Sequence, residues 1–213
     1  MTKLIIFDMD GVLVDSEDAM ALMTKKALRD GWGIDCDVEE FRPFRGMGDR
    51  AYVGGVSEAH GVAYEEAMKA ESYRLFCGNA PRLVRVMPWS VELIEALEAR
   101  GFMLSVASAA DRIKVEANLA CLGRGTRDFA SVVTGADVER VKPAPDIFLR
   151  AAELCGVDPS EALVCEDAIS GVRAAKSAGM TAVAVTTSFP RAALTEAGAD
   201  YVFDDLRDML AIL

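Results

Sequence analysis

A set of polar side chains follows short apolar runs of the chain and has the chemistry that phosphoryl transfer needs. The set contains four carboxylates, a hydroxyl and an ammonium: Asp8, Asp10, Ser108, Lys142, Glu166 and Asp167. Clustered carboxylates repel one another unless a cation lies among them, and hard oxygen ligands favour Mg²⁺. A lysine and a serine beside such a cation would bind the oxygens of a phosphoryl group while a carboxylate attacks phosphorus. The set therefore predicts Mg²⁺-dependent phosphoryl transfer.

The elements that must position these side chains alternate between strands and helices. Apolar, β-prone runs are expected to form strands at residues 3–7, 102–107, 129–134, 162–165 and 181–185. Helical patterns separate them at residues 91–100, 111–122, 146–155, 170–178 and 191–197. This alternation predicts an α/β fold with a doubly wound parallel sheet. Ligands of such sheets bind beyond the carboxyl ends of the strands, where the polar set lies.

The segment from residue 15 to residue 85 breaks this alternation and is expected to be an inserted helical cap. Its predicted helices are residues 18–30, 37–41, 50–60 and 64–76, and the α/β core then comprises residues 1–14 and 86–213. The glycine-containing loop 44–50 is the candidate for substrate recognition, with Arg45 and Gly46 as contacts. Ala109, next to Ser108, is a further candidate for substrate binding.

Composition excludes several other classes of function. The chain has 213 residues, with 23 Lys and Arg against 34 Asp and Glu and a net charge of −11, which argues against nucleic acid as a partner. No apolar run is long enough to cross a membrane. The 5 cysteines show no Cys-x-x-Cys spacing, and His60 is the only histidine, so a zinc site is not expected. We expect a cytoplasmic monomer that acts on a small phosphorylated metabolite.

Four segments resemble, in order, the motifs of haloacid dehalogenase superfamily phosphotransferases. The segments are FDMDGV at residues 7–12, VAS at 106–108, KPAPDIF at 142–148 and CEDAISGV at 165–172. The resemblance is closest to the subgroup with a small helical cap after the first strand. That subgroup includes β-phosphoglucomutase and many sugar-phosphate phosphatases.

The resemblance implies a role for each motif residue in phosphoryl transfer. Asp8 would be the nucleophile that forms an aspartyl-phosphate. Asp10 would protonate the leaving oxygen and then deprotonate the attacking water or hydroxyl. Ser108 and Lys142 would bind the transferring phosphoryl group. The dehalogenases that gave the superfamily its name lack an acid at the position of Asp10, so phosphorus is the expected target.

The resemblance also implies a Mg²⁺ site. Asp8, the backbone carbonyl of Asp10, and Asp167 would hold the ion. Glu166 would be a further ligand, either in direct contact with the ion or one step removed. Gly171 is expected to permit close packing near the last motif.

Alternative functions remain open on the sequence alone. A phosphosugar mutase is the main alternative to a sugar-phosphate phosphatase. Hydrolysis is favoured because Met20 stands where the mutases commonly have a histidine, and Asp111 and Arg112 replace an asparagine of the mutase pattern. A signalling receiver domain is shorter and has no helical insert. A non-catalytic binding module would not need the complete polar set.

Overall fold

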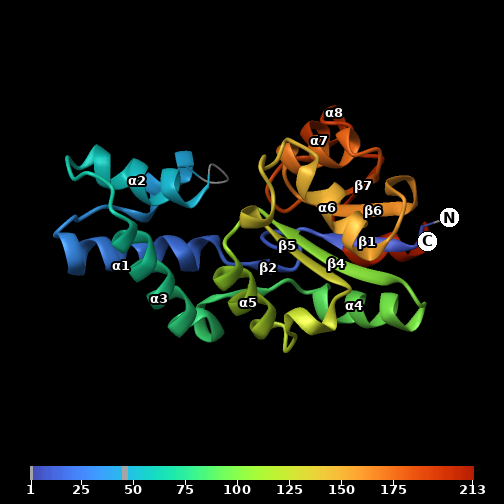
Figure 1. Ribbon diagram of the computed structural model, residues 1–213, viewed down its shortest axis with the longest axis horizontal. Helices are drawn as coiled ribbons and strands as arrows, with labels where there is room; N and C mark the ends of the chain where they lie inside the picture. Colours follow the sequence, from blue (N-terminus) through green and yellow to red (C-terminus); the bar gives the residue numbers. More distant parts are fainter. Residues whose placement is uncertain (1, 45–47) are drawn as a thin grey trace.

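The core of the protein is a parallel sheet that positions the polar set at one edge. The computed structural model describes residues 2–44 and 48–213. Within them, a six-stranded sheet has the order β5-β4-β1-β6-β7-β8, and all neighbours are parallel (Figure 1). The strands are β1 (Leu4–Phe7), β4 (Met103–Ser108), β5 (Ser131–Thr134), β6 (Ala162–Glu166), β7 (Thr181–Val185) and β8 (Tyr201–Phe203). The doubly wound α/β fold is confirmed, and the edge strand β8 is an addition to the predicted set.

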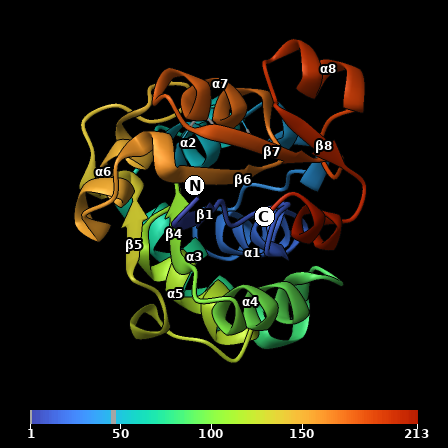
Figure 2. The ribbon, with the colours of Figure 1, turned by 90° about the vertical axis from the view of Figure 1, so that its right-hand side faces the viewer.

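Helices cover both faces of this sheet, so its central strands are apolar on both sides (Figure 2). In β1, Ile5 and Phe7 belong to one buried cluster, whereas Leu4 and Ile6 belong to the other, as the two-residue period of a strand requires. The first face packs against α4 (Ser90–Ala99), α5 (Arg112–Cys121) and η5 (Leu206–Ala211). The second face packs against α6 (Asp146–Cys155), α7 (Ile169–Ser177) and α8 (Arg191–Glu196). Short 3₁₀ turns complete the core at η2 (Thr126–Asp128), η3 (Gly135–Asp137) and η4 (Pro159–Glu161).

The segment between β2 and β3 is a helical module beside the sheet (Figure 1). Its elements are α1 (Glu17–Trp32), η1 (Val38–Phe44), α2 (Asp49–Ala59) and α3 (Glu66–Leu83). The module has its own apolar cluster, in which Leu28, Phe41 and Met68 are fully buried. The segment expected as a helix at 37–41 is a 3₁₀ helix, and α3 continues to Leu83 instead of ending at residue 76.

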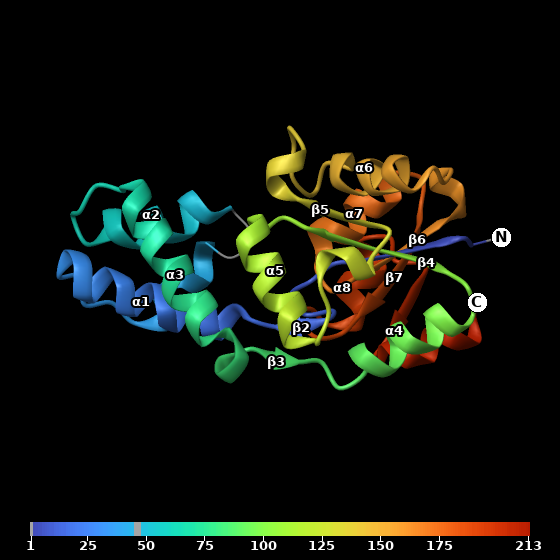
Figure 3. The ribbon, with the colours of Figure 1, turned by 60° about the horizontal axis from the view of Figure 1, so that its bottom comes forward.

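The two connections between module and sheet pair with each other. β2 (Val14–Asp15) and β3 (Arg85–Val86) form a short antiparallel ladder, which Figure 3 shows at the junction of the two parts. The Arg85 guanidinium also lies 2.5 Å from the Asp15 carboxylate. Chain exit and chain re-entry therefore meet at one place, near the expected connections at residues 12–16 and 82–88. The division into a core and a cap at residues 15 and 85 stays a prediction.

Two further features of the described residues bear on the sequence predictions. His60 lies at the C-terminal end of α2, before Gly61, and its Nε2 atom is 2.8 Å from Oε2 of Glu40. His60 therefore has a structural contact within the helical module. No helix in residues 2–44 and 48–213 has the length and apolar character needed to cross a membrane.

Candidate active site

Three adjacent strands bring the predicted site residues to one edge of the sheet. Asp8 follows β1 directly, Ser108 ends β4 and Glu166 ends β6, and β1 lies between the other two. This edge and the helical module enclose a cleft of about 1030 Å³. The predicted site residues that the structure describes all line it: Asp8, Asp10, Ser108, Ala109, Lys142, Glu166 and Asp167.

Lys142 lies at the base of the cleft between two carboxylates. Its ammonium donates to Oδ1 of Asp8 at 2.5 Å, to Oε1 of Glu166 at 2.6 Å and to the backbone carbonyl of Ala107 at 3.3 Å. It also lies 4.9 Å from the centre of the Phe148 ring, within the range of a cation–π contact. The lysine comes from the proline-containing loop that precedes α6, and its side chain is buried. The ammonium is therefore fixed where an anion in the cleft would meet it.

The site has more negative charge than Lys142 alone can balance. Burial and the charge of Glu166 raise the pKa of Asp8 to about 7, although Lys142 opposes this. Burial, Glu166 and Asp8 likewise raise the pKa of Asp167 well above its ordinary value. Burial alone would lower the pKa of Lys142, but Asp8 and Glu166 raise it above the ordinary lysine value. The ammonium therefore stays charged, and the carboxylates still favour a further cation.

Glu166 is held by the protein through both of its oxygens. Oε1 accepts from Lys142, and Oε2 accepts from the backbone amides of Asp167 and Ala168 at 2.8 Å each. A Cβ atom on Gly171 would lie 1.7 Å from Oε1, so a glycine is required there for Glu166 to occupy this place. This confirms the close packing expected at Gly171. Both oxygens of Glu166 are thus occupied by protein donors, which suits an indirect contact with a metal ion.

Asp167 is oriented by two hydroxyls that the sequence analysis did not identify. Its Oδ2 atom accepts from the Ser188 hydroxyl and lies 3.4 Å from Oγ1 of Thr187. Thr187 also donates to the backbone carbonyl of Gly11 at 2.7 Å, which links the first and last motifs. Gly11 has φ +78, and a Cβ there would lie 1.9 Å from Oδ2 of Asp167. Both hydroxyls follow β7, so their place at the carboxyl end of a predicted strand is the signal that could have identified them.

Asp10 is held separately from Asp8 by a second lysine. Oδ1 of Asp10 accepts from the Ser16 hydroxyl, and Oδ2 accepts from Nζ of Lys114 at 2.8 Å. The Asn118 side-chain amide donates to the Ser16 hydroxyl at 3.3 Å. None of these three partners was predicted from the sequence, because a serine before a helix and polar residues within a helix are common features.

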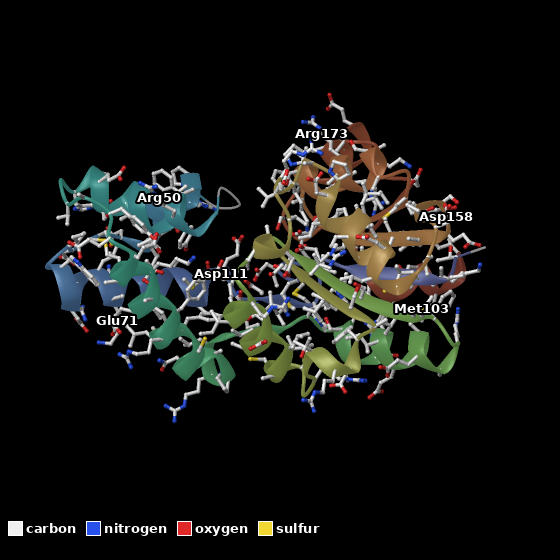
Figure 4. All side chains as sticks on the ribbon, in the orientation of Figure 1. Arg50, Glu71, Met103, Asp111, Asp158 and Arg173 are labelled. Carbon is white, nitrogen blue, oxygen red and sulfur yellow. The ribbon has the colours of Figure 1, made fainter. Side chains whose placement is uncertain are left out.

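Ser108 and the candidate loop 44–50 are the remaining predicted parts of the site. Ser108 is buried and its hydroxyl accepts from the backbone amide of Ala110 at 3.3 Å. Arg45 and Gly46 lie outside the described residues. Arg50, the last residue of the candidate loop 44–50, lies in α2 (Figure 4), and its guanidinium is 5.5 Å from the centre of the Tyr64 ring on the helical module. Other module residues line the cleft, and they include Met20, Arg42, Phe44 and Tyr52.

The residues present fit a Mg²⁺ ion through a small ligand set. The described residues contain no group of three His, Cys, Asp or Glu side chains arranged to hold a metal. The predicted set needs only two carboxylates, Asp8 and Asp167, with the backbone carbonyl of Asp10. Both carboxylates are buried, and burial together with the charge of Glu166 raises their pKa values even though Lys142 lowers them, so a cation between the two would be stabilised. Hard oxygen donors of this kind suit Mg²⁺ better than a softer metal.

Comparisons with known proteins agree with this geometry. The model of the haloacid dehalogenase-like hydrolase family matches residues 5–185. SUPPRESSOR OF QUENCHING 1 of Arabidopsis thaliana, a chloroplastic protein, is 38% identical over 95% of this chain, which spans only 19% of that protein. Validoxylamine A 7'-phosphate phosphatase of Streptomyces hygroscopicus subsp. limoneus is 30% identical over 98% of this chain and 96% of that protein.

A solved structure supports the same relationship. A CbbY variant from Rhodobacter sphaeroides, in complex with xylulose-(1,5)bisphosphate, superposes with a TM-score of 0.84 at 26% identity. The match covers 98% of this chain and 96% of that chain. The fold, the ordered motifs and the length of the family match lead to one conclusion: the chain belongs to the haloacid dehalogenase-like hydrolase family.

Proposed function

We propose that the protein is a Mg²⁺-dependent phosphatase that hydrolyses a small phosphorylated metabolite through an aspartyl-phosphate on Asp8. The observation that carries this proposal is the position of the Lys142 ammonium, 2.5 Å from Oδ1 of Asp8 at the base of the cleft. A carboxylate beside a fixed cation is suited to attack a phosphoryl group whose oxygens that cation neutralises. Asp10, held apart by Ser16 and Lys114, supplies a second carboxyl for the proton.

The first half of the reaction forms the covalent intermediate. The Asp8 carboxylate attacks phosphorus, so an Asp8 oxygen–phosphorus bond forms and the bond to the leaving oxygen breaks. Asp10 gives its proton to that oxygen, which leaves as an alcohol. Lys142 and the Ser108 hydroxyl bind the phosphoryl oxygens during the transfer. When bound, Mg²⁺ would be held by Asp8, Asp167 and the carbonyl of Asp10, and it would neutralise charge on the phosphoryl group.

The second half releases inorganic phosphate. Asp10, now a carboxylate, takes a proton from a water molecule, whose oxygen attacks phosphorus. The Asp8 oxygen–phosphorus bond breaks, and Asp8 returns to its starting form. Glu166 keeps Lys142 in place throughout, because its Oε1 atom lies 2.6 Å from the ammonium. The helical module limits the access of bulk water to the cleft, to which it contributes part of the lining.

We infer a sugar phosphate or a related polyhydroxylated phosphate as the substrate. The named substrate of the Streptomyces relative is a phosphate ester, and the CbbY variant is in complex with a sugar bisphosphate. A mutase is the alternative, and it would return an isomeric sugar phosphate instead of free phosphate. Met20, at the position where the mutases commonly have a histidine, lines the cleft and cannot exchange a proton, so the lining favours hydrolysis. The protein is further proposed to act as a monomer in the cytoplasm.

Phosphate release from a panel of sugar phosphates and an aryl phosphate tests the proposal. The assay compares wild type with Asp8→Asn, in Mg²⁺ and in EDTA. Asp158→Asn is the matched control, since Asp158 is an exposed turn residue of the core, remote from the helical module (Figure 4). The proposal requires Mg²⁺-dependent release by wild type and by the control, and loss of release in Asp8→Asn. Interconversion of sugar phosphates without net release of phosphate would instead establish a mutase.

A further inference from the structure

Lys114 is a buried lysine that none of the motifs includes. It lies in the first turns of α5, and only 8% of its surface is exposed. Its Nζ atom lies 2.8 Å from Oδ2 of Asp10, 104 positions away in the chain. Burial of an ammonium is costly unless a charge partner compensates it, and Asp10 provides that partner.

The packing of α5 fixes where this ammonium lies. Val115 and Leu119 anchor the helix in the apolar cluster below the sheet. Lys114 and Asn118, one turn apart, are both buried at the side where Asp10 and Ser16 lie. The helix therefore contacts the Asp10 carboxylate twice: directly through Lys114, and through Ser16, to which Asn118 donates.

The two lysines of the cleft have different partners. Lys142 contacts Asp8 and Glu166, whereas Lys114 contacts Asp10. The nucleophile and the proton-transfer group thus have separate cations. A hydrogen-bonded ammonium orients the carboxyl group of Asp10 and also stabilises the carboxylate that remains after Asp10 has given up its proton.

We propose that Lys114 is the positioning residue for the proton-transfer step of Asp10. This inference rests on the proposed phosphatase function and adds a residue that acts through Asp10 without touching the phosphoryl group. The effect of losing Lys114 on activity should depend on the leaving group of the substrate. An alkyl alcohol needs a proton as it leaves, whereas p-nitrophenolate is a weak base and leaves without one. Loss of Lys114 should therefore impair alkyl phosphates selectively.

The test measures kcat/KM for glycerol phosphate and for p-nitrophenyl phosphate, because this ratio reports formation of the covalent intermediate. Lys114→Met is expected to lower the value for the alkyl ester by about tenfold to a hundredfold, part of the factor of about 10² to 10⁴ that a general acid supplies. The value for the aryl ester should stay within about threefold of wild type. Lys114→Arg keeps the charge and should lose less than Lys114→Met. Lys176→Met is the matched control. Lys176 lies on α7, another helix of the core, and pairs with Asp200.

A double-mutant cycle separates positioning from a general structural effect. In the Asp10→Asn background, Lys114→Met should cause no further selective loss on glycerol phosphate, because its effect requires Asp10. Equal losses on both esters, additive losses in the double variant, or an unchanged alkyl activity would each overturn the proposal. Thermal unfolding of each variant identifies a folding defect, which would lower both activities together.

The two proposals fail in different ways. If wild type releases phosphate from none of the sugar phosphates in the panel and from neither of these esters, the phosphatase function is wrong, and the role of Lys114 falls with it. If wild type is active and Asp8→Asn is inactive, but Lys114→Met shows no dependence on the leaving group, only the inference about Lys114 is wrong.

Discussion

Nζ of Lys142 lies 2.5 Å from Oδ1 of Asp8, although the two residues are 134 positions apart in the chain. The parallel sheet creates this contact, because Asp8 follows β1 and the Lys142 loop reaches the same edge before α6. Lys142→Met should lower phosphatase kcat by about a hundredfold or more, the scale seen when one stabilising donor is removed from a transition state. Phosphate release under saturating substrate measures this loss.

Lys142→Arg tests whether charge alone is sufficient. The ammonium contacts three oxygens within a buried space, and a planar guanidinium cannot reproduce that arrangement. We therefore expect Lys142→Arg to stay at least about tenfold below wild type in kcat. Activity near that of wild type in either Lys142 variant would show that the lysine does not act on the transferring group.

Mg²⁺ should stabilise the folded protein, because a bound cation offsets the mutual repulsion of Asp8, Glu166 and Asp167 at the site. Binding to the folded state raises the free energy of unfolding, by about 2.7 kcal/mol at a ligand concentration of 100 times Kd. Thermal unfolding with Mg²⁺, against NaCl of equal ionic strength, measures the shift. Asp167→Asn removes one predicted ligand and should reduce it. An equal shift in wild type and Asp167→Asn would contradict the predicted ligand set.

Stability without Mg²⁺ should depend on pH through Asp8. Burial and Glu166 raise the pKa of Asp8 in the folded protein to about 7, whereas an unfolded aspartate titrates near 4. The folded state then binds more protons between these values, so this contribution is complete at low pH and is lost as pH rises towards 7. In EDTA, wild type should therefore lose stability relative to Asp8→Asn as the pH rises from about 4 to about 7. Chemical unfolding at a series of pH values measures the difference, and a constant difference would contradict the prediction.

Gly171 should tolerate no side chain. A Cβ there would lie 1.7 Å from Oε1 of Glu166, so Gly171→Ala must displace the carboxylate that holds Lys142. We expect a stability loss of about 1 to 3 kcal/mol together with reduced kcat. Gly31→Ala is the matched control, because a Cβ at that position would meet nothing within 4 Å and α1 continues through it. That substitution should leave stability unchanged or raise it by up to about 1 kcal/mol.

Much of the fold could be predicted because strand and helix periods are clear in the sequence. β7 lies at the expected residues, and α6 begins and ends where predicted. β8 was missed because three residues at a sheet edge carry too short a pattern. The end of α3 was missed because Gly78 and Pro81 disfavour a helix, whereas burial of Ala80 keeps the chain helical there.

Some residues of the candidate site could likewise be predicted from the sequence, whereas others could not. Residues at strand ends, such as Asp8 and Ser108, could be found because parallel strands bring their carboxyl ends together. Lys114 could not, because its role depends on how α5 is rotated about its axis, which the packing of the helix determines. Arg50 has a charge that suits substrate recognition and ends the candidate loop 44–50, but the structure places it in α2, and its contact with Tyr64 depends on the packing of the helical module.

The covalent intermediate on Asp8 can be detected by peptide mapping with mass spectrometry. The protein is mixed with a phosphate monoester and Mg²⁺, quenched in acid within the first turnovers and digested. We expect a phosphoryl group on the peptide that contains Asp8, present in wild type and absent in Asp8→Asn. Rapid phosphate release by wild type with no phosphoryl group on that peptide at any quench time would contradict it.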